Sequence, residues 1–234
     1  MTSTDVTPSF NGIYGIPEVA KYLAATPPFT NCNSIPVTTL RYWIRTSTVL
    51  LSPHVFPTRQ RFVTFLDLVS MRLAFILKSR GIKLQEIRST RIWLEQELKI
   101  EWPFANRLLW TYGSHVFIQF RDHLLAASKS GQLAMDFLED WLEKVEIDME
   151  FDANDKASSW SPYDGIQLDP KIQFGEPCIE GTRIPTYVIG GKQKAGDSLE
   201  RIAALYNLEQ YQVENAIRWE QRLDTINGRP ILFN

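Results

Sequence analysis

The sequence predicts a mainly α-helical protein with small β elements, an α+β fold. Apolar residues recur at helical spacing in several segments, and β-branched residues occur in short runs broken by proline, as in residues 46–64. Three helical segments follow one another near the C-terminus, at about 186–194, 198–206 and 209–223. A chain of 234 residues with 44% hydrophobic and 22% charged residues can form one large or two small domains with well-packed cores.

The first hundred residues predict four helices and two short strands. Residues 15–25 read as a helix with Pro17 in its first turn, and 26–36 as a loop rich in proline and asparagine. A second helix covers 37–45, and two short strands lie within 46–64. Thr64 can cap the next helix, with Asp67 as a capping-box partner; this helix ends at Gly81, and residues 83–98 form a further element.

The helix at 37–45, VTTLRYWIR, has two chemically different faces. Leu40, Trp43 and Ile44 form an apolar face, and we expect Leu40 and Trp43 to lie in a core near Val69 and Leu73. The opposite face is basic, hydroxyl-bearing and aromatic, and it consists of Thr38, Arg41, Tyr42 and Arg45. Arginine can read guanine edges in a major groove, whereas threonine and tyrosine can reach phosphates. An ordinary surface helix with solvated arginines is the alternative.

The charge is distributed unevenly along the chain, although the net charge is only −2. Residues 1–100 carry 12 Lys/Arg against 6 Asp/Glu, residues 101–160 carry 5 against 11, and residues 161–234 carry 8 against 10. A basic first part attached to an acidic remainder is typical of a local nucleic-acid-binding surface.

The middle of the chain, residues 101–165, predicts a small acidic α+β connector. Residues 107–120 are expected to form a hairpin around Gly113–Ser114, and 135–145 a short acidic helix. A second hairpin is expected in 146–162, with its turn at 152–156. Three carboxylates lie close together in the sequence, at Asp148, Glu150 and Asp152. Such a group can bind a metal, but here the carboxylates alternate with apolar residues, which favours the solvated face of a strand.

The last part, residues 166–224, predicts a three-helix domain of a DNA-binding or protein-docking type. Asp197 and Glu200 form a candidate capping box for the middle helix. The residues expected to pack the three helices together are Ile202, Ala203, Leu205, Val213, Ala216 and Ile217. A tail of residues 225–234 follows.

Several kinds of chemistry have no support in the sequence. Phosphate-binding glycine loops and hydrolase or metalloprotease motifs are absent, so we expect no enzymatic activity, no cofactor and no metal. The two cysteines, Cys32 and Cys178, are far apart, and His54, His115 and His123 are scattered. No secretion signal or membrane-spanning stretch is found, so a cytoplasmic location is expected.

Residues 13–98 resemble the MerR-like winged helix-turn-helix family. Three motifs appear in the order of that family: RYW at Arg41–Trp43, RFVTFLDL at Arg61–Leu68, and RGIKLQEI at Arg80–Ile87. The long loop 26–36 departs from the tight turn that the family usually has. The resemblance implies that the helix 37–45 recognises DNA and that a wing follows it.

Residues 166–222 resemble the "domain of unknown function 433" family, an antitoxin-like group. The motifs are Asp169–Pro170, FGEPCIEGTRIPT and KAGDSLERIAALYNLEQYQVENAIRW; Glu176 stands where that family usually has a basic residue. In GTRIP, Gly181 permits a tight turn, Pro185 sets the next helix, and Arg183 can have a structural role or contact a partner.

A chain that combines these two regions resembles the larger VapB-type antitoxins. The two resemblances imply an antitoxin that binds its operator as a homodimer or as a hetero-oligomer with its toxin, and that inhibits a PIN-domain ribonuclease. A stand-alone MerR-like regulator is the alternative. The expected DNA-binding residues are Thr38, Thr39, Arg41, Tyr42, Arg45, Arg59, Gln60 and Arg61. The expected toxin-binding residues are Arg229, Ile231, Leu232 and Phe233, unless the tail packs on the protein itself or is disordered.

Overall fold

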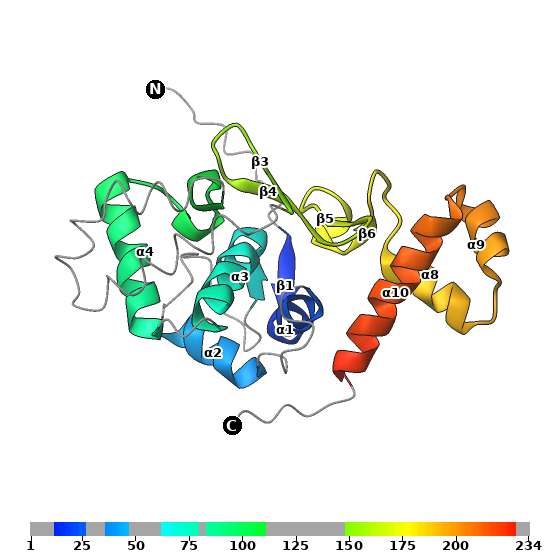
Figure 1. Cartoon of the computed structure of the whole chain (residues 1–234), viewed down its shortest axis with the longest axis horizontal. Coiled ribbons are helices and arrows are strands. Elements are labelled where there is room, and N and C mark those ends of the chain that lie inside the picture. Colours follow the sequence, from blue (N-terminus) through cyan, green and yellow to red (C-terminus); the bar gives the residue numbers. More distant parts are fainter. Residues whose placement is uncertain (1–11, 27–35, 47–61, 80–82, 111–147, 228–234) are drawn as a thin grey trace, which may run out of the picture.

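A computed structural model describes residues 12–26, 36–46, 62–79, 83–110 and 148–227 of the chain. Within these ranges the protein is mainly helical with two small antiparallel sheets, which confirms the predicted α+β class. In Figure 1, α4 lies at one end of the molecule and α8, α9 and α10 lie at the other, with α1, α3 and the larger sheet between them. No helix of the described ranges is both long and apolar enough to cross a membrane.

The helices predicted for the N-terminal part are all present. They are α1 (Ile16–Ala25), α2 (Val37–Arg45), α3 (Phe65–Ser79) and α4 (Leu84–Leu98). The loop between α1 and α2, the helix stop at Gly81 and most of the segment between α2 and α3 lie outside the described residues.

The structure contains a strand that the sequence analysis missed. β1 (Ile13–Gly15) precedes α1 and pairs antiparallel with β2 (Phe62–Thr64), so that Tyr14 lies opposite Val63. A run of three residues is too short to show the alternation by which a strand is recognised. This pairing ties the start of α1 to the start of α3.

The predicted capping box at the start of α3 is confirmed. The carboxylate Oδ2 of Asp67 accepts hydrogen bonds from the backbone N–H and the hydroxyl of Thr64, both at 2.8 Å. The backbone N–H of Asp67 in turn donates to Thr64 Oγ1 at 3.3 Å. Since the first N–H groups of a helix have no partner within it, this exchange fixes where α3 begins.

The hairpin predicted for residues 107–120 is wrong over its described part. A short 3₁₀ turn, η2 (Pro103–Ala105), is followed by helical residues at 107–110. Asn106 explains the difference, because its side-chain oxygen accepts a hydrogen bond from the N–H of Leu108 at 2.9 Å, which is the usual way in which asparagine starts a helix. The other residues of that hairpin, and the acidic helix at 135–145, lie outside the described residues.

The larger sheet contains four antiparallel strands in the order β3-β4-β5-β6. The hairpin predicted in 146–162 is confirmed, because β3 pairs with β4 on either side of residues 152–156. β4 continues through a turn at Gly165 into β5, so the sheet includes residues from both the expected connector and the expected C-terminal domain. The strands are β3 (Met149–Phe151), β4 (Ala157–Tyr163), β5 (Ile166–Leu168) and β6 (Cys178–Ile179).

The three C-terminal helices are confirmed as α8 (Thr186–Lys194), α9 (Leu199–Tyr206) and α10 (Gln210–Asn227). Two details differ from the prediction. Ser198 is the N-cap of α9, and its Oγ accepts a hydrogen bond from the N–H of Arg201, whereas Asp197 forms an ion pair with Arg201 at 3.4 Å. Leu205 is 60% exposed instead of packed, because the short α9 is buried through a narrow stripe at Ile202.

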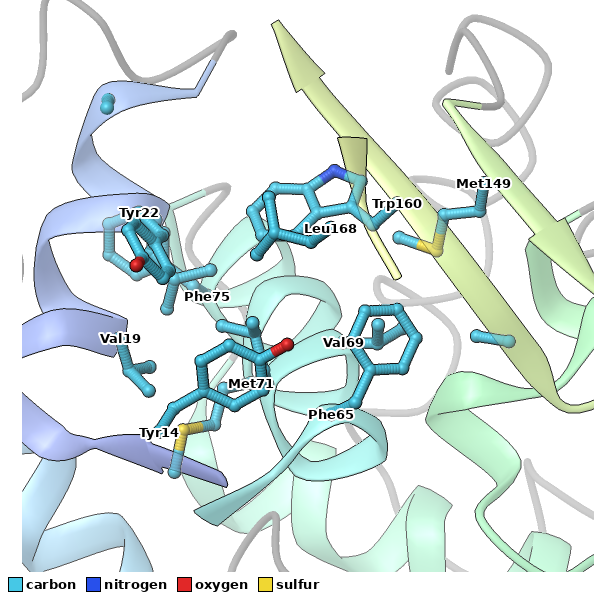
Figure 2. Close-up of a cluster of buried hydrophobic side chains, with 14 of the residues drawn as sticks. Tyr14, Val19, Tyr22, Phe65, Val69, Met71, Phe75, Met149, Trp160 and Leu168 are labelled. Carbon is cyan, nitrogen blue, oxygen red and sulfur yellow. The ribbon is translucent and has the colours of Figure 1, made fainter. Parts of the chain in front are cut away.

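One continuous cluster of buried side chains connects these elements. Figure 2 shows Tyr22 of α1 and Phe75 of α3 on the side of the cluster towards Leu168 and Trp160 of the larger sheet, and Val19 of α1 belongs to the same cluster. All of these side chains are less than 9% exposed. The N-terminal helices and the sheet therefore share a core.

The packing of α10 on α1 joins the two groups of helices. The ring of Trp219 lies 6.3 Å from that of Tyr22, and the guanidinium of Arg222 donates to the carbonyl of Ala25 at 3.3 Å. Close by, the hydroxyl of Tyr14 donates to the carbonyl of Gly175 at 3.1 Å. Gly175 has φ of +89°, and a Cβ there would lie 2.1 Å from this hydroxyl, so glycine is required at this contact.

Two adjacent glycines of α8 allow a test of how closely α8 packs on α10. A Cβ at Gly190 would lie 2.9 Å from Cγ and 3.1 Å from Cβ of Glu220, whereas a Cβ at Gly191 would meet no atom within 4 Å. We predict that Gly190→Ala destabilises the protein by about 1–3 kcal/mol through overpacking. Gly191→Ala should instead stabilise it by about 0.5–1 kcal/mol, since alanine is the better helix former.

Urea unfolding followed by circular dichroism measures both changes. Each variant serves as the control for the other, because they make the same substitution one residue apart. Equal effects of the two substitutions would contradict the close approach of α8 to α10.

Candidate nucleic-acid interface

α2 is held in place by its apolar face. The predicted burial of Leu40 and Trp43 is confirmed, because Leu40 is fully buried and Trp43 is 2% exposed within the hydrophobic core. The helix packs against α1. Two large side chains buried on one side fix the rotation of a nine-residue helix, and so decide which residues face outward.

The opposite face of α2 is exposed over its whole length. The side chains that lie there are Thr38, Arg41, Tyr42 and Arg45, the same four that the helical spacing predicts. Tyr42 is 48% exposed. We call these four residues the α2 face.

The ends of α2 are defined by the residues that flank it. Pro36 is the N-cap with an extended backbone, and its carbonyl accepts from the N–H of Thr39 at 2.9 Å. At the other end, the hydroxyl and the N–H of Thr46 both donate to the carbonyl of Tyr42 at 2.9 Å. Thr39 is only half exposed, so it lies at the edge of the α2 face.

The two arginines of the α2 face are exposed, so their guanidinium groups can reach a binding partner. The guanidinium of Arg45 lies 5.7 Å from the centre of the Tyr42 ring, a cation–π contact on the helix surface. Among the residues that the structure describes, neither Arg41 nor Arg45 pairs with a carboxylate. An exposed guanidinium without an internal partner can bind a phosphate or a base edge without first breaking an ion pair.

The remaining predicted site residues lie outside the described part of the chain. These are Arg59, Gln60 and Arg61 of the expected wing and Arg229, Ile231, Leu232 and Phe233 of the expected toxin contact. In sequence, Arg61 directly precedes β2, the strand that pairs with β1.

The three carboxylates around β3 each have partners within the protein. Glu150 accepts a hydrogen bond from the hydroxyl of Ser159 at 2.9 Å, and Asp152 accepts from the N–H of Lys156 at 3.0 Å. The prediction that Asp148 lies on a solvated face is wrong, because its carboxylate forms an ion pair with Arg72 at 2.8 Å. No group of three metal-binding side chains occurs in the described ranges.

The ion pair of Arg72 with Asp148 was missed by sequence reasoning. Burial lowers the pKa of Arg72 and raises that of Asp148, while the attraction between the two charges opposes both shifts. Arg72 also lies 4.8 Å from the ring of Trp160 and 5.9 Å from that of Trp110. The available signal was an arginine in the middle of the apolar run from Leu68 to Leu77, which is buried on all sides.

The GTRIP segment has the local structure that its residue types predict. Gly181 has φ of +73°, and the hydroxyl of Thr182 donates to the carbonyl of Ile179 at 2.8 Å. Pro185 is the N-cap of α8. The side chain of Arg183 is exposed, and its backbone carbonyl accepts from the side chain of Gln173 at 3.1 Å.

Of the cysteines and histidines, only Cys178 lies in the part of the chain that the structure describes. Cys178 is buried as a free thiol, and burial followed by the nearby charges of Glu176 and Asp169 raises its pKa to about 11. It is therefore protonated and unreactive at neutral pH. Cys32 and the three histidines lie outside the described residues.

The C-terminal part matches a known family. Residues 166–219 match the family described as "Protein of unknown function (DUF433)", which confirms the resemblance found there. This range begins with β5 and ends within α10 at Trp219. A search of the curated proteins finds no match to the sequence.

The fold is similar to that of a solved structure. The crystal structure of Rv2018 from Mycobacterium tuberculosis superposes with a TM-score of 0.67, at 20% sequence identity, over 87% of this chain and 96% of that one. At this identity the similarity shows a shared fold.

Proposed function

We propose that this protein is a DNA-binding antitoxin, which recognises operator DNA through the α2 face and inhibits a PIN-domain ribonuclease through its C-terminal half. The observation that carries the DNA-binding part is the α2 face itself. Two arginines, a threonine and a tyrosine are exposed together on a helix whose other side is locked into the core.

The shape of α2 supports insertion into DNA. A major groove about 12 Å wide accepts one α-helix, and arginine makes two hydrogen bonds to guanine there. Arg41 and Arg45 are one helical turn apart, so both can reach the same groove. Thr38 and Tyr42 carry hydroxyls that suit phosphate oxygens on the groove walls.

The expected winged helix-turn-helix is part of the same proposal. β2 follows directly after Arg61 and pairs with β1 at the start of α1, so a wing in residues 46–61 would end beside the helix on which α2 rests. Arg59 and Arg61 would then contact phosphates on either side of the recognition helix.

The antitoxin part of the proposal is supported by the C-terminal region. It matches the DUF433 family, which is the C-terminal half of the resemblance from which the antitoxin role is inferred. Each of its three helices exposes a large apolar side chain, namely Tyr187 at 58%, Leu205 at 60% and Tyr211 at 61%. In the proposed complex Arg229 enters the acidic magnesium site of the ribonuclease, and the apolar residues after it pack on the same protein. The protein would act in the cytoplasm.

DNA recognition by the α2 face can be measured by fluorescence anisotropy with the DNA upstream of the gene. Arg41→Ala should weaken binding by about 1–3 kcal/mol and relax sequence preference, because a base contact is lost. Arg61→Ala should lower the salt slope of binding by about one unit, because a phosphate contact is lost. Arg201→Ala is the matched control, since Arg201 is an exposed arginine of α9. Unchanged affinity and salt slope in both test variants would contradict the proposal.

The inhibitory element can be tested by co-expression with the ribonuclease encoded beside the gene. Truncation after Asn227 leaves α10 whole and keeps Leu223 and Ile226, which pack against the core. We predict that the truncated protein no longer co-purifies with the ribonuclease and no longer blocks RNA cleavage, whereas the full chain does both.

Full inhibition by the truncated protein would show that the ribonuclease contact lies instead on the helices between Asp197 and Arg222. Failure of the full chain to bind any neighbouring ribonuclease would favour a stand-alone regulator. Neither outcome affects the DNA-binding measurement, so the two parts of the proposal can fail separately.

A further inference from the structure

The C-terminal end of α1 needs a hydrogen-bond donor from outside the helix. α1 ends at Ala25, and no lysine or arginine lies in its last turn. The last carbonyl groups of a helix have no partner within it and carry a partial negative charge, so they favour a donor or a cation. The hydroxyl of Thr26 donates to the carbonyl of Tyr22 at 2.7 Å. Ala25 is buried, so its carbonyl depends on a donor from within the protein.

Arg222 of α10 supplies this donor. Its Nη1 donates to the carbonyl of Ala25 at 3.3 Å, although the two residues are 197 positions apart in the chain. In Figure 1 the C-terminal end of α10 lies beside α1. A guanidinium at this place brings a positive charge to the negative end of the α1 dipole, in addition to the hydrogen bond. A C-terminal helix therefore caps a helix of the N-terminal part.

The guanidinium of Arg222 is held in place by an aromatic ring. It lies 4.8 Å from the centre of the Tyr163 ring, which is a cation–π distance. The Tyr163 ring lies 6.1 Å from that of Trp219, which in turn contacts Tyr22 of α1. Within the described part of the chain no carboxylate pairs with Arg222. Its charge therefore acts on the end of α1 without being neutralised by an ion pair.

The position of α2 depends on α1. α2 is the next helix after α1 in the chain, and it packs against α1 with Leu40 and Trp43 buried in the shared core. Helix ends are among the places where a folded protein opens most easily. If the last turn of α1 opened, α2 would lose part of the surface that fixes the direction of the α2 face.

We propose that Arg222 is a positioning residue for DNA recognition. By capping the end of α1 from α10, it keeps α2 in the orientation in which the α2 face fits a major groove. Arg222 does not contact the DNA and acts only through α1. This inference rests on the DNA binding proposed above, and it gives the C-terminal helices a part in that binding.

The test uses full-length protein and the anisotropy measurement with the DNA upstream of the gene. Arg222→Met removes the charge and the donors but keeps most of the apolar length of the side chain. Arg222→Lys keeps the charge but not the flat guanidinium that lies against Tyr163. Arg218→Met is the matched control, because Arg218 is an exposed arginine one turn earlier in α10 that pairs with Glu214 of the same helix at 3.3 Å.

The measurements are made at a temperature at which circular dichroism shows every variant to be folded. Arg222→Met should bind the DNA about 2–30-fold more weakly. The salt slope should stay as in the wild type, because no phosphate contact is lost. Without DNA, hydrogen exchange should be faster in peptides covering residues 20–26 and 36–46 and unchanged in α9. Arg222→Lys should restore part of the affinity, and Arg218→Met should behave as the wild type.

Four results would overturn the inference. Wild-type affinity and exchange in Arg222→Met would show that α2 does not depend on this cap. A salt slope lowered by about one unit would show that Arg222 contacts a phosphate itself. Equal weakening by Arg218→Met would assign the effect to the overall charge of α10. Faster exchange in α9 as well would show a general loss of stability.

Arg41→Ala separates a failure of this inference from a failure of the proposed DNA binding. If Arg41→Ala weakens binding and Arg222→Met does not, the role of Arg222 is wrong and the DNA-binding proposal stands. If Arg41→Ala also leaves binding unchanged, the α2 face is not the DNA-binding surface, and the role of Arg222 is wrong as well.

Discussion

The packing of α10 on α1 is the contact on which the rest of the structure depends. α8 and α9 are attached to α10, and α2 is attached to α1, so this helix pair connects the C-terminal helices with the α2 face. Tyr22 and Trp219 supply its aromatic contact, and Arg222 both donates to Ala25 and lies 4.8 Å from the ring of Tyr163. A substitution that loosens the packing of α1 on α10 is therefore expected to affect both the C-terminal helices and α2.

The larger sheet provides a second connection, with a different physical basis. Arg72 of α3 is buried beneath the sheet, where a lone charge would be costly. The carboxylate of Asp148 and the ring of Trp160 both lie against it, and Trp160 also donates its indole N–H to Asp148 at 3.1 Å. These contacts fix α3 relative to β3 and β4. α3 in turn shares the hydrophobic core with the buried faces of α1 and α2.

What the sequence predicted well was local. The two faces of α2, the Thr64–Asp67 capping box and the hairpin of β3 and β4 all depend on residues within a few positions of one another. The features it missed depend on distant partners: β1 needs β2, and the burial of Asp148 needs Arg72. Of the expected DNA-binding residues, those of α2 lie in the described part of the chain, and Thr39 is less exposed than the four residues of the α2 face.

We propose that the α2 face binds DNA while α1, which packs on α10, supports the buried side of α2. Hydrogen–deuterium exchange of the full chain, with and without double-stranded operator DNA, tests this most directly. The account predicts that DNA slows exchange in peptides covering residues 37–46 and leaves those of α9 and the first half of α10 unchanged. Protection confined to α9 and α10, or none in residues 37–46 at saturating DNA, would contradict it.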